Sequence, residues 1–143
     1  MFSKTCEYAI RALIFIAQQT KDGSKVGIKV IAKEIDSPVY FIAKILQDLS
    51  RKSYVQSVKG PNGGFYLNEQ NRKTTLAEIV REMDGNKLFD GCALGLKECS
   101  SAHPCPIHDQ YRHVKDKLKN ILETSIIDEM ADKLDEQLAF LRK

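Results

Sequence analysis

The sequence has no apolar run long enough to cross a bilayer and no secretory signal. Its apolar stretch near the N-terminus, Ala9 to Ala17, is interrupted by Arg11 and lacks both a basic start and a small-residue cleavage site. No internal repeat or low-complexity tract is visible either. We therefore expect a cytoplasmic protein with no membrane partner, in a compartment where cysteine thiols stay reduced.

The motifs of the common enzyme classes are also missing. The four cysteines include no Cys-x-x-Cys pair, and no thioredoxin-like strand–helix–strand pattern surrounds them. We find no paired carboxylates, no phosphate-binding glycine loop and no constellation around a nucleophile. The sequence therefore predicts a protein that is not an enzyme.

What the chain does contain is an ordinary globular composition with an uneven charge distribution. Its 143 residues are 43% hydrophobic and 29% charged, which suits one compact domain or a small domain with an appendage. The formal net charge of +3 does not by itself indicate nucleic-acid binding. However, the first sixty residues are basic and hold only five acidic residues, whereas residues 125–143 hold more acids than bases. This split is typical of a DNA-binding domain joined to a separate dimerisation element.

The first seventy residues predict a winged helix-turn-helix. Helices are expected over 3–20, 28–35 and 38–51, the last with Ser37 as N-cap and Pro38 at its first position. Two strands, 54–58 and 65–67, flank the turn sequence "KGPNGG" and form a hairpin, or wing. The fold class expected is mainly α with a small β-hairpin. A small α+β domain with a solvated lysine face is the alternative.

Within this unit, two segments are candidates for contact with double-stranded DNA. The helix over 38–51 would enter the major groove, and the wing would lie against the backbone or in the minor groove. The candidate DNA-binding residues are Ser37, Pro38, Val39, Tyr40, Lys44, Lys59, Gly60, Asn62 and Gly64.

The C-terminal half predicts a dimerisation element. A helix over 75–85 has a Thr75–Glu78 capping box and ends at Gly85. A long helix then begins near Pro106, and Ser125 with Asp128 would cap a last helix that runs to the C-terminus. The apolar seam of the long helix is best buried against a second copy of the chain; its members are Val114, Leu118, Ile121, Leu122 and Ser125. The expected units are 1–85 (winged helix-turn-helix), 86–108 (cysteine-rich loop) and 109–143 (dimerisation and C-terminal helices).

Three cysteines in a short, glycine- and proline-containing loop predict an inorganic centre. Cys92, Cys99 and Cys105 are spaced C-x6-C-x5-C, and Cys105 begins a Cys-x-x-His with His108. Thiolates with an imidazole suit an iron–sulfur cluster or Zn²⁺, although zinc knots usually have closer cysteine pairs. Three unrelated buried or free cysteines are the alternative. Cys6, alone among apolar residues of the first helix, is expected to be a core residue.

These features together resemble the winged-helix iron–sulfur transcription regulators of the IscR/NsrR type. The resemblance covers nearly the whole chain. It rests on "CEYAIRALIFIA" near the start, the Ser-Pro helix, the wing "SVKGPNGGFYL", the helix "TLAEIVREMDG" and the three-cysteine loop before a long helix.

The resemblance implies a homodimer that binds a palindromic DNA site, with one iron–sulfur cluster per subunit held by Cys92, Cys99 and Cys105. A 2Fe–2S cluster is favoured, 4Fe–4S is possible, and a zinc-stabilised or thiol-based protein without iron chemistry is the alternative. The fourth ligand implied is His108, as in IscR-like proteins, or Glu7 of the partner subunit, as in NsrR-like proteins.

The chain also departs from the family pattern. The usual cysteine spacing is C-x5-C-x5-C, so the first loop here is one residue longer. Ala43 stands where IscR has a base-reading glutamate, and Lys59 stands where the wing has an arginine. We therefore expect a DNA target different from the one that IscR reads.

Overall fold

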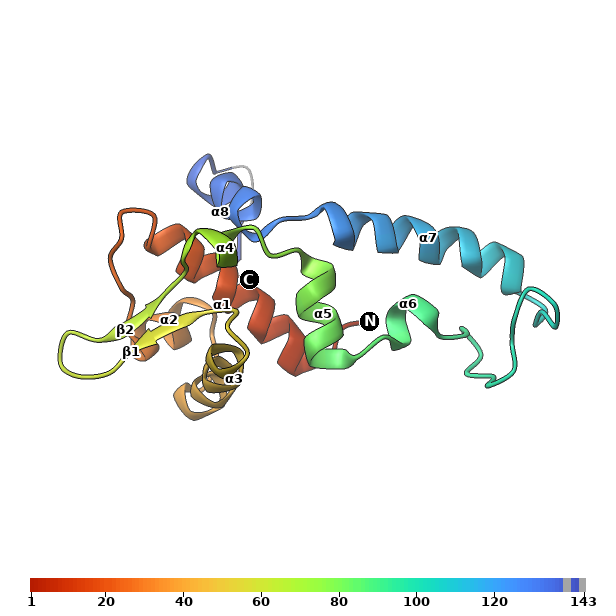
Figure 1. Ribbon diagram of the computed structural model, residues 1–143, viewed down its shortest axis with the longest axis horizontal. Coiled ribbons are helices and arrows are strands. Elements are labelled where there is room, and N and C mark those ends of the chain that lie inside the picture. Colours follow the sequence, from red (N-terminus) through yellow and green to blue (C-terminus); the bar gives the residue numbers. More distant parts are fainter. Residues whose placement is uncertain (138–139, 142–143) are drawn as a thin grey trace.

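Helix α1 (Lys4–Gln19) is the element around which the N-terminal body is built. The computed structural model describes residues 1–137 and 140–141. In it this helix runs through the middle of the body, and an arm made by α6, a long loop and α7 extends away from the body (Figure 1). As expected, Ser3 caps α1, since its side-chain oxygen accepts a hydrogen bond from the Cys6 N–H. Nine of the sixteen residues of α1 are buried, which explains its nearly continuous apolar sequence.

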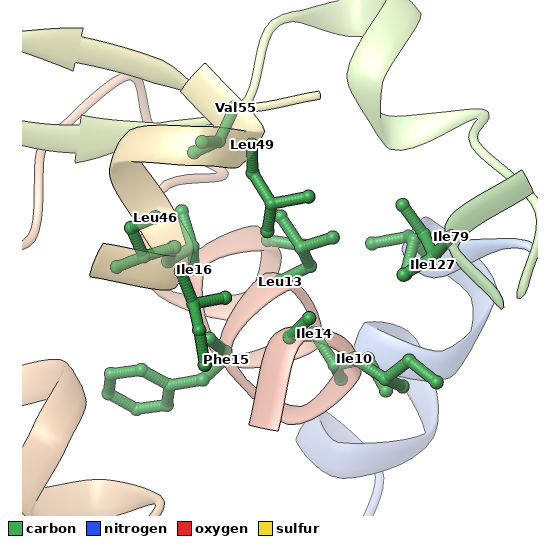
Figure 2. Close-up of a cluster of buried hydrophobic side chains, with 14 of the residues drawn as sticks. Ile10, Leu13, Ile14, Phe15, Ile16, Leu46, Leu49, Val55, Ile79 and Ile127 are labelled. Atoms are coloured by element: carbon green, nitrogen blue, oxygen red, sulfur yellow. The ribbon is translucent and has the colours of Figure 1, made fainter. Parts of the chain in front are cut away.

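The core consists mainly of aliphatic side chains that several elements direct onto α1. Leu13 and Ile16 of α1 are almost completely buried, and Figure 2 shows them among side chains from the elements that follow. Leu46 and Leu49 come from α3, and Ile127 comes from the far end of the chain. The C-terminal segment therefore completes the core of the N-terminal body.

The helix-turn-helix consists of α2 (Ile28–Glu34) and α3 (Val39–Arg51). The start of α3 differs by one residue from the expectation, because Pro38 is the N-cap and Val39 the first helical residue. Ser37 does not cap the helix. Its hydroxyl donates to the Pro38 carbonyl oxygen at 3.2 Å instead of accepting from the first-turn N–H groups.

The wing is a two-stranded antiparallel hairpin of β1 (Gln56–Val58) and β2 (Gly64–Tyr66), in which Ser57 pairs with Phe65. Phe65 also forms a β-bridge with Val26, so the base of the wing is attached to the segment before α2. Gly64 has a φ of +151°, and a Cβ there would lie 2.8 Å from the Val26 carbonyl oxygen. This close approach of two backbones explains the glycine.

A buried asparagine fixes the wing relative to α3. Asn71, in the short helix α4 (Glu69–Arg72), is 5% exposed. Its Nδ2 donates to the carbonyl oxygen of Ser53, just after α3, at 2.7 Å. Its Oδ1 accepts from Gln56 Nε2 of β1 at 3.1 Å and from the Asn68 N–H at 3.2 Å. One side chain thus connects the end of α3 with both ends of the hairpin.

We expect the substitution Asn71→Ala to lower the free energy of unfolding by about 2 kcal/mol, because it leaves a buried carbonyl and two donors without their partner. Asn68→Ala is the matched control. It removes the cap of α4, whose cost is about 1 kcal/mol. Urea unfolding followed by circular dichroism measures both. Equal losses in the two variants would contradict the special role of Asn71.

Helix α5 (Leu76–Asp84) begins and ends as the sequence predicted. Thr75 and Glu78 form the expected capping box, and Gly85 ends the helix with a φ of +75°. The short helix α6 (Lys87–Asp90) follows, and then the cysteine loop leads to α7 (His108–Thr124).

Helix α8 (Ile127–Asp135) differs from the expected last helix at both ends. Its N-cap is Ile126, because the Ser125 hydroxyl donates to the Ile121 carbonyl oxygen at 2.6 Å and is not available for capping. The helix ends at Asp135, not at the C-terminus. Residues 138–139 and 142–143, which the sequence placed in this helix, lie outside the described residues.

Ion pairs attach α8 to the N-terminal body. Lys21 lies 2.5 Å from both Asp132 and Asp135, and Arg72 lies 2.9 Å from Asp128. In Figure 1, α8 accordingly lies beside α1 and α4, whereas α7 projects away. Among the helices of the described part of the chain, none is long and apolar enough to cross a membrane.

Candidate metal centre and nucleic-acid interface

The loop between α6 and α7 brings three cysteines together at the end of the arm (Figure 1). The sulfur atoms of Cys92, Cys99 and Cys105 all lie within 4.8 Å of one another. The Cys92 and Cys105 sulfurs are 3.8 Å apart, and His108 Nδ1 lies 3.2 Å from the Cys99 sulfur. All four side chains are half-buried. The spacing in the sequence thus corresponds to one convergent group of donors.

Local hydrogen bonds explain how the wide C-x6-C-x5-C spacing closes. The Gly95 N–H donates to the Cys92 carbonyl at 3.0 Å, which turns the chain just after the first cysteine. The Ser100 N–H donates to the His103 carbonyl at 3.2 Å, which makes a second turn between the other two cysteines. Finally, the His108 N–H donates to the Cys105 carbonyl at 3.0 Å, and His108 is the first residue of α7. Two turns and a helix start therefore bring the four side chains together.

The thiols of the chain differ strongly in acidity. Hydrogen bonds from the backbone N–H groups of Leu96 and Leu94 lower the pKa of Cys92 to about 7. By contrast, burial, with a smaller contribution from the nearby Asp84 carboxylate, raises the pKa of Cys6 to about 12. Thiolates bind metals and react with electrophiles, so Cys92 is poised for both, and Cys6 is an inert core residue as the sequence predicted.

We expect iodoacetamide to modify the metal-free protein first at Cys92, with a rate that rises to half its plateau near pH 7. The thiolate fraction of Cys92 grows as pH passes its lowered pKa, so its reactivity is greater at pH 8 than at pH 6. Cys6 should stay unmodified until the chain unfolds. Peptide mass spectrometry at several pH values measures both rates. Equal labelling of the two cysteines in folded protein would contradict this assignment.

The other residues considered as ligands, two histidines and Glu7, do not belong to the group formed by the three cysteines and His108 within one chain. His103 is exposed, and its contact within the loop is through its backbone N–H to the Ser100 hydroxyl at 3.1 Å. His113 is exposed on α7, as expected for a surface residue. Glu7 is half-buried on α1 and forms an ion pair with Lys4 at 3.7 Å.

The expected recognition residues of α3 lie at its exposed N-terminal end. Tyr40 is 79% exposed and Val39 43% exposed, although both are large hydrophobic residues. Lys44, one turn after Tyr40, and Pro38 are exposed as well, whereas Ser37 is half-buried. An exposed tyrosine and lysine on the second helix of a helix-turn-helix can reach base edges or phosphates.

The expected wing residues form the turn of the hairpin. Lys59, Gly60 and Asn62 are exposed there. Gly64 is half-buried at the base of the wing. Its close approach to the Val26 backbone requires a glycine there whether or not Gly64 contacts DNA.

The sequence did not reveal how α1 supports the start of α3. The Arg11 guanidinium lies 4.6 Å from the centre of the Tyr8 ring, and that ring packs edge-on against Phe41 at 5.3 Å. Arg11 also donates to the Ile35 carbonyl oxygen, in the helix-turn-helix, at 3.4 Å. The available signal in the sequence was Arg11, the single charged residue within the apolar stretch from Ala9 to Ala17.

Comparisons with known proteins agree with this architecture. The chain matches the Rrf2 family, described as an iron-dependent transcriptional regulator, over residues 2–133. It is 30% identical over 132 residues to a protein of Aquifex aeolicus designated an HTH-type transcriptional regulator, covering 91% of this chain and 90% of that protein. It is 31% identical over 97 residues to the regulator NsrR of Geobacillus kaustophilus, covering 68% of this chain and 60% of that protein.

Solved structures show the same fold. CymR, the global cysteine regulator of B. subtilis, superposes with a TM-score of 0.77 at 18% identity, covering 92% of this chain and 96% of that one. IscR of T. potens superposes with a TM-score of 0.71 at 22% identity, covering 97% and 92%. The expected winged-helix fold is thereby confirmed. The relatives are named as transcriptional regulators, which confirms the expectation of a non-enzymatic role. The chain therefore belongs to the Rrf2 family of transcriptional regulators.

Proposed function

We propose that this chain is a homodimeric, cytoplasmic, DNA-binding regulator whose affinity for a palindromic promoter site depends on an iron–sulfur cluster. The observation that carries the proposal is the convergence of three cysteine sulfurs within 4.8 Å, on an arm attached to a winged helix-turn-helix. The relatives named NsrR and IscR, and the description of the family as iron-dependent, support it.

The donor set fits an iron–sulfur cluster. Cys92, Cys99 and Cys105 would supply thiolates, and His108, whose Nδ1 is 3.2 Å from the Cys99 sulfur, would be the fourth ligand. Soft thiolates with an imidazole are suitable ligands for iron–sulfur clusters, and the lowered pKa of Cys92 favours its ligating form. When bound, the cluster supplies a redox- and oxygen-sensitive centre. We favour 2Fe–2S over 4Fe–4S, since a histidine ligand is compatible with the former.

Contact with DNA would come from α3 and the wing. Ser37, Pro38 and Val39 begin the recognition helix, and Tyr40 with Lys44 would face the major groove. The exposed wing turn would place Lys59, Gly60 and Asn62, with Gly64 at its base, against the backbone or in the minor groove.

Dimerisation would use α7. Val114 is 61% exposed and Ile121 56% exposed, and their seven-residue spacing places them on one face of this helix. Leu118, half-buried between them, extends that face, whereas Leu122 is 2% exposed and packs within the chain. A second copy would cover the exposed residues and impose twofold symmetry on the DNA site. The functional units would then be 1–85, 86–108 and 109–143.

Contacts of the arm with the body offer a route from the loop to the DNA-binding unit. Arg81 of α5 pairs with Glu123 of α7 at 3.2 Å and lies 4.2 Å from the Phe89 ring of α6. At the end of α5, Asp84 accepts a hydrogen bond from the Ser3 N–H at 2.8 Å, at the start of α1. Holding the four ligands together would order the loop and set the position of α7, and with it the separation of the two recognition helices.

The test is to purify the protein without oxygen and to record its visible absorption and its iron, sulfide and zinc contents. A coloured protein containing iron and sulfide supports the proposal, whereas stoichiometric zinc without sulfide supports a zinc-stabilised protein. The affinity for a promoter fragment is then compared before and after removal of the cluster by a chelator. Equal affinities would rule out the regulatory dependence.

A further inference from the structure

Several cations of the N-terminal body are paired with carboxylates. Lys52, for example, lies 3.3 Å from Asp48 and 2.7 Å from Glu82. The cations that form ion pairs within the described part of the chain are Lys4, Lys21, Arg51, Lys52, Arg72 and Arg81. The carboxylates beside these lysines and arginines would repel a polyanion such as DNA.

A second group of lysines is different. Lys25, Lys29 and Lys33 are exposed, and none makes an ion pair with any residue that the structure describes. They recur every four residues from the turn before α2 into α2 itself. We refer to these three residues as the lysine track.

The lysine track begins at the base of the wing. Val26, the neighbour of Lys25, pairs with Phe65 of β2. The Cβ of Lys25 lies 3.3 Å from the position that a Cβ on Gly64 would occupy. Lys25 is therefore beside the hairpin that carries Lys59 at its turn.

The track then follows the exposed side of α2. Ile31 and Ala32 face the core, so Lys29 and Lys33, one turn apart, lie together on an outer face. This helix packs against α3, and its C-terminal end leads through the turn at Ser37 into the recognition helix. The track thus spans the interval between the wing and the start of α3.

We propose that Lys25, Lys29 and Lys33 bind the phosphate backbone of the duplex between the segments contacted by the wing and by α3. The inference rests on the proposed DNA-binding function. The segment that carries these lysines contacts β2 through Val26 and packs against α3 through α2, so a duplex that touches both the wing and α3 would pass close to it. Unpaired lysines there would neutralise phosphates and release counterions. These contacts carry affinity and orientation, not sequence preference.

The test is the salt dependence of binding to two labelled duplexes, one that carries a candidate promoter sequence and one of random sequence. Each substitution removes one lysine from both subunits of the proposed homodimer. We therefore expect each of K25A, K29A and K33A to make the slope of log K against log salt concentration less steep by about 1.8, and the triple variant by about 5.4. Affinity for the two duplexes should fall by the same factor. The corresponding Lys→Arg variants should keep the wild-type slope.

Lys73→Ala is the matched control. Lys73 is also exposed and without an ion pair to a described residue, but it follows α4, which packs against α8. We expect it to leave the slope unchanged. A triple variant that binds both duplexes with the wild-type slope would overturn the lysine track alone, whereas a wild-type protein that binds neither duplex would overturn the proposed function.

Discussion

Replacing Cys92, Cys99 or Cys105 by serine should reduce the bound iron and acid-labile sulfide of the anaerobically purified protein by at least about tenfold. Each thiolate is one of three that converge within 4.8 Å, and a serine hydroxyl at that point is a much poorer ligand for iron. The visible absorption should disappear together with the sulfide. Because the three cysteines lie in the loop at the end of the arm, the winged-helix body should keep its thermal unfolding temperature within a few degrees.

The control for this experiment is Cys6→Ala. Cys6 is the remaining cysteine of the chain, lies in the core and has a pKa raised to about 12, so its removal should leave iron and sulfide unchanged. If serine in place of the three loop cysteines leaves the metal content and the promoter affinity at wild-type levels, the centre is not held as proposed.

The same preparation distinguishes the two candidates for the fourth ligand. His108 stands 3.2 Å from the Cys99 sulfur within one subunit, whereas Glu7 would have to come from the partner subunit. We expect His108→Ala to change the absorption spectrum and to accelerate loss of iron in air, and Glu7→Gln to change neither. The opposite pattern would assign the position to Glu7 of the partner subunit.

Helix ends could be predicted from the sequence where the hydrogen bonds that stabilise them join residues close together in the chain. The capping box of Thr75 and Glu78 and the end of α5 at Gly85 involve residues at most four positions from the groups they bond. The cap of α1 by Ser3 is equally local. The convergence of Cys92, Cys99 and Cys105 could be predicted because short loops limit how far apart the sulfurs can be.

Features that depend on distant partners could not be predicted. The attachment of α8 to α1 depends on ion pairs between Lys21 and residues more than a hundred positions away. The position of the wing depends on Asn71 reaching back to Ser53. Ser125 has the sequence of a helix cap, yet its hydroxyl bonds to the preceding turn of α7 instead. In each case the local structure depends on which group lies nearby in the folded chain, and a single sequence does not identify that group.

Introducing charge into the exposed apolar face of α7 should convert the protein to a monomer. We expect the double variant V114D/I121D to sediment as a monomer at concentrations where the wild type is a dimer. Burial of a valine or isoleucine side chain contributes about 1.5–3 kcal/mol, and twofold symmetry doubles the number of side chains lost. The substituted carboxylates would also have to be desolvated opposite one another, which adds a further penalty.

Loss of dimerisation in this variant should weaken its binding to DNA. A dimer engages both half-sites of a palindrome at once, whereas a monomer engages one, so affinity for a promoter fragment should drop by about a hundredfold or more. Asn120→Asp is the control, since it adds a carboxylate to an exposed position about a third of a turn from the apolar face. The control should stay dimeric and bind normally. A double variant that remains a dimer would show that subunits associate through another surface, and a monomeric wild type would show that the exposed face of α7 has a different partner.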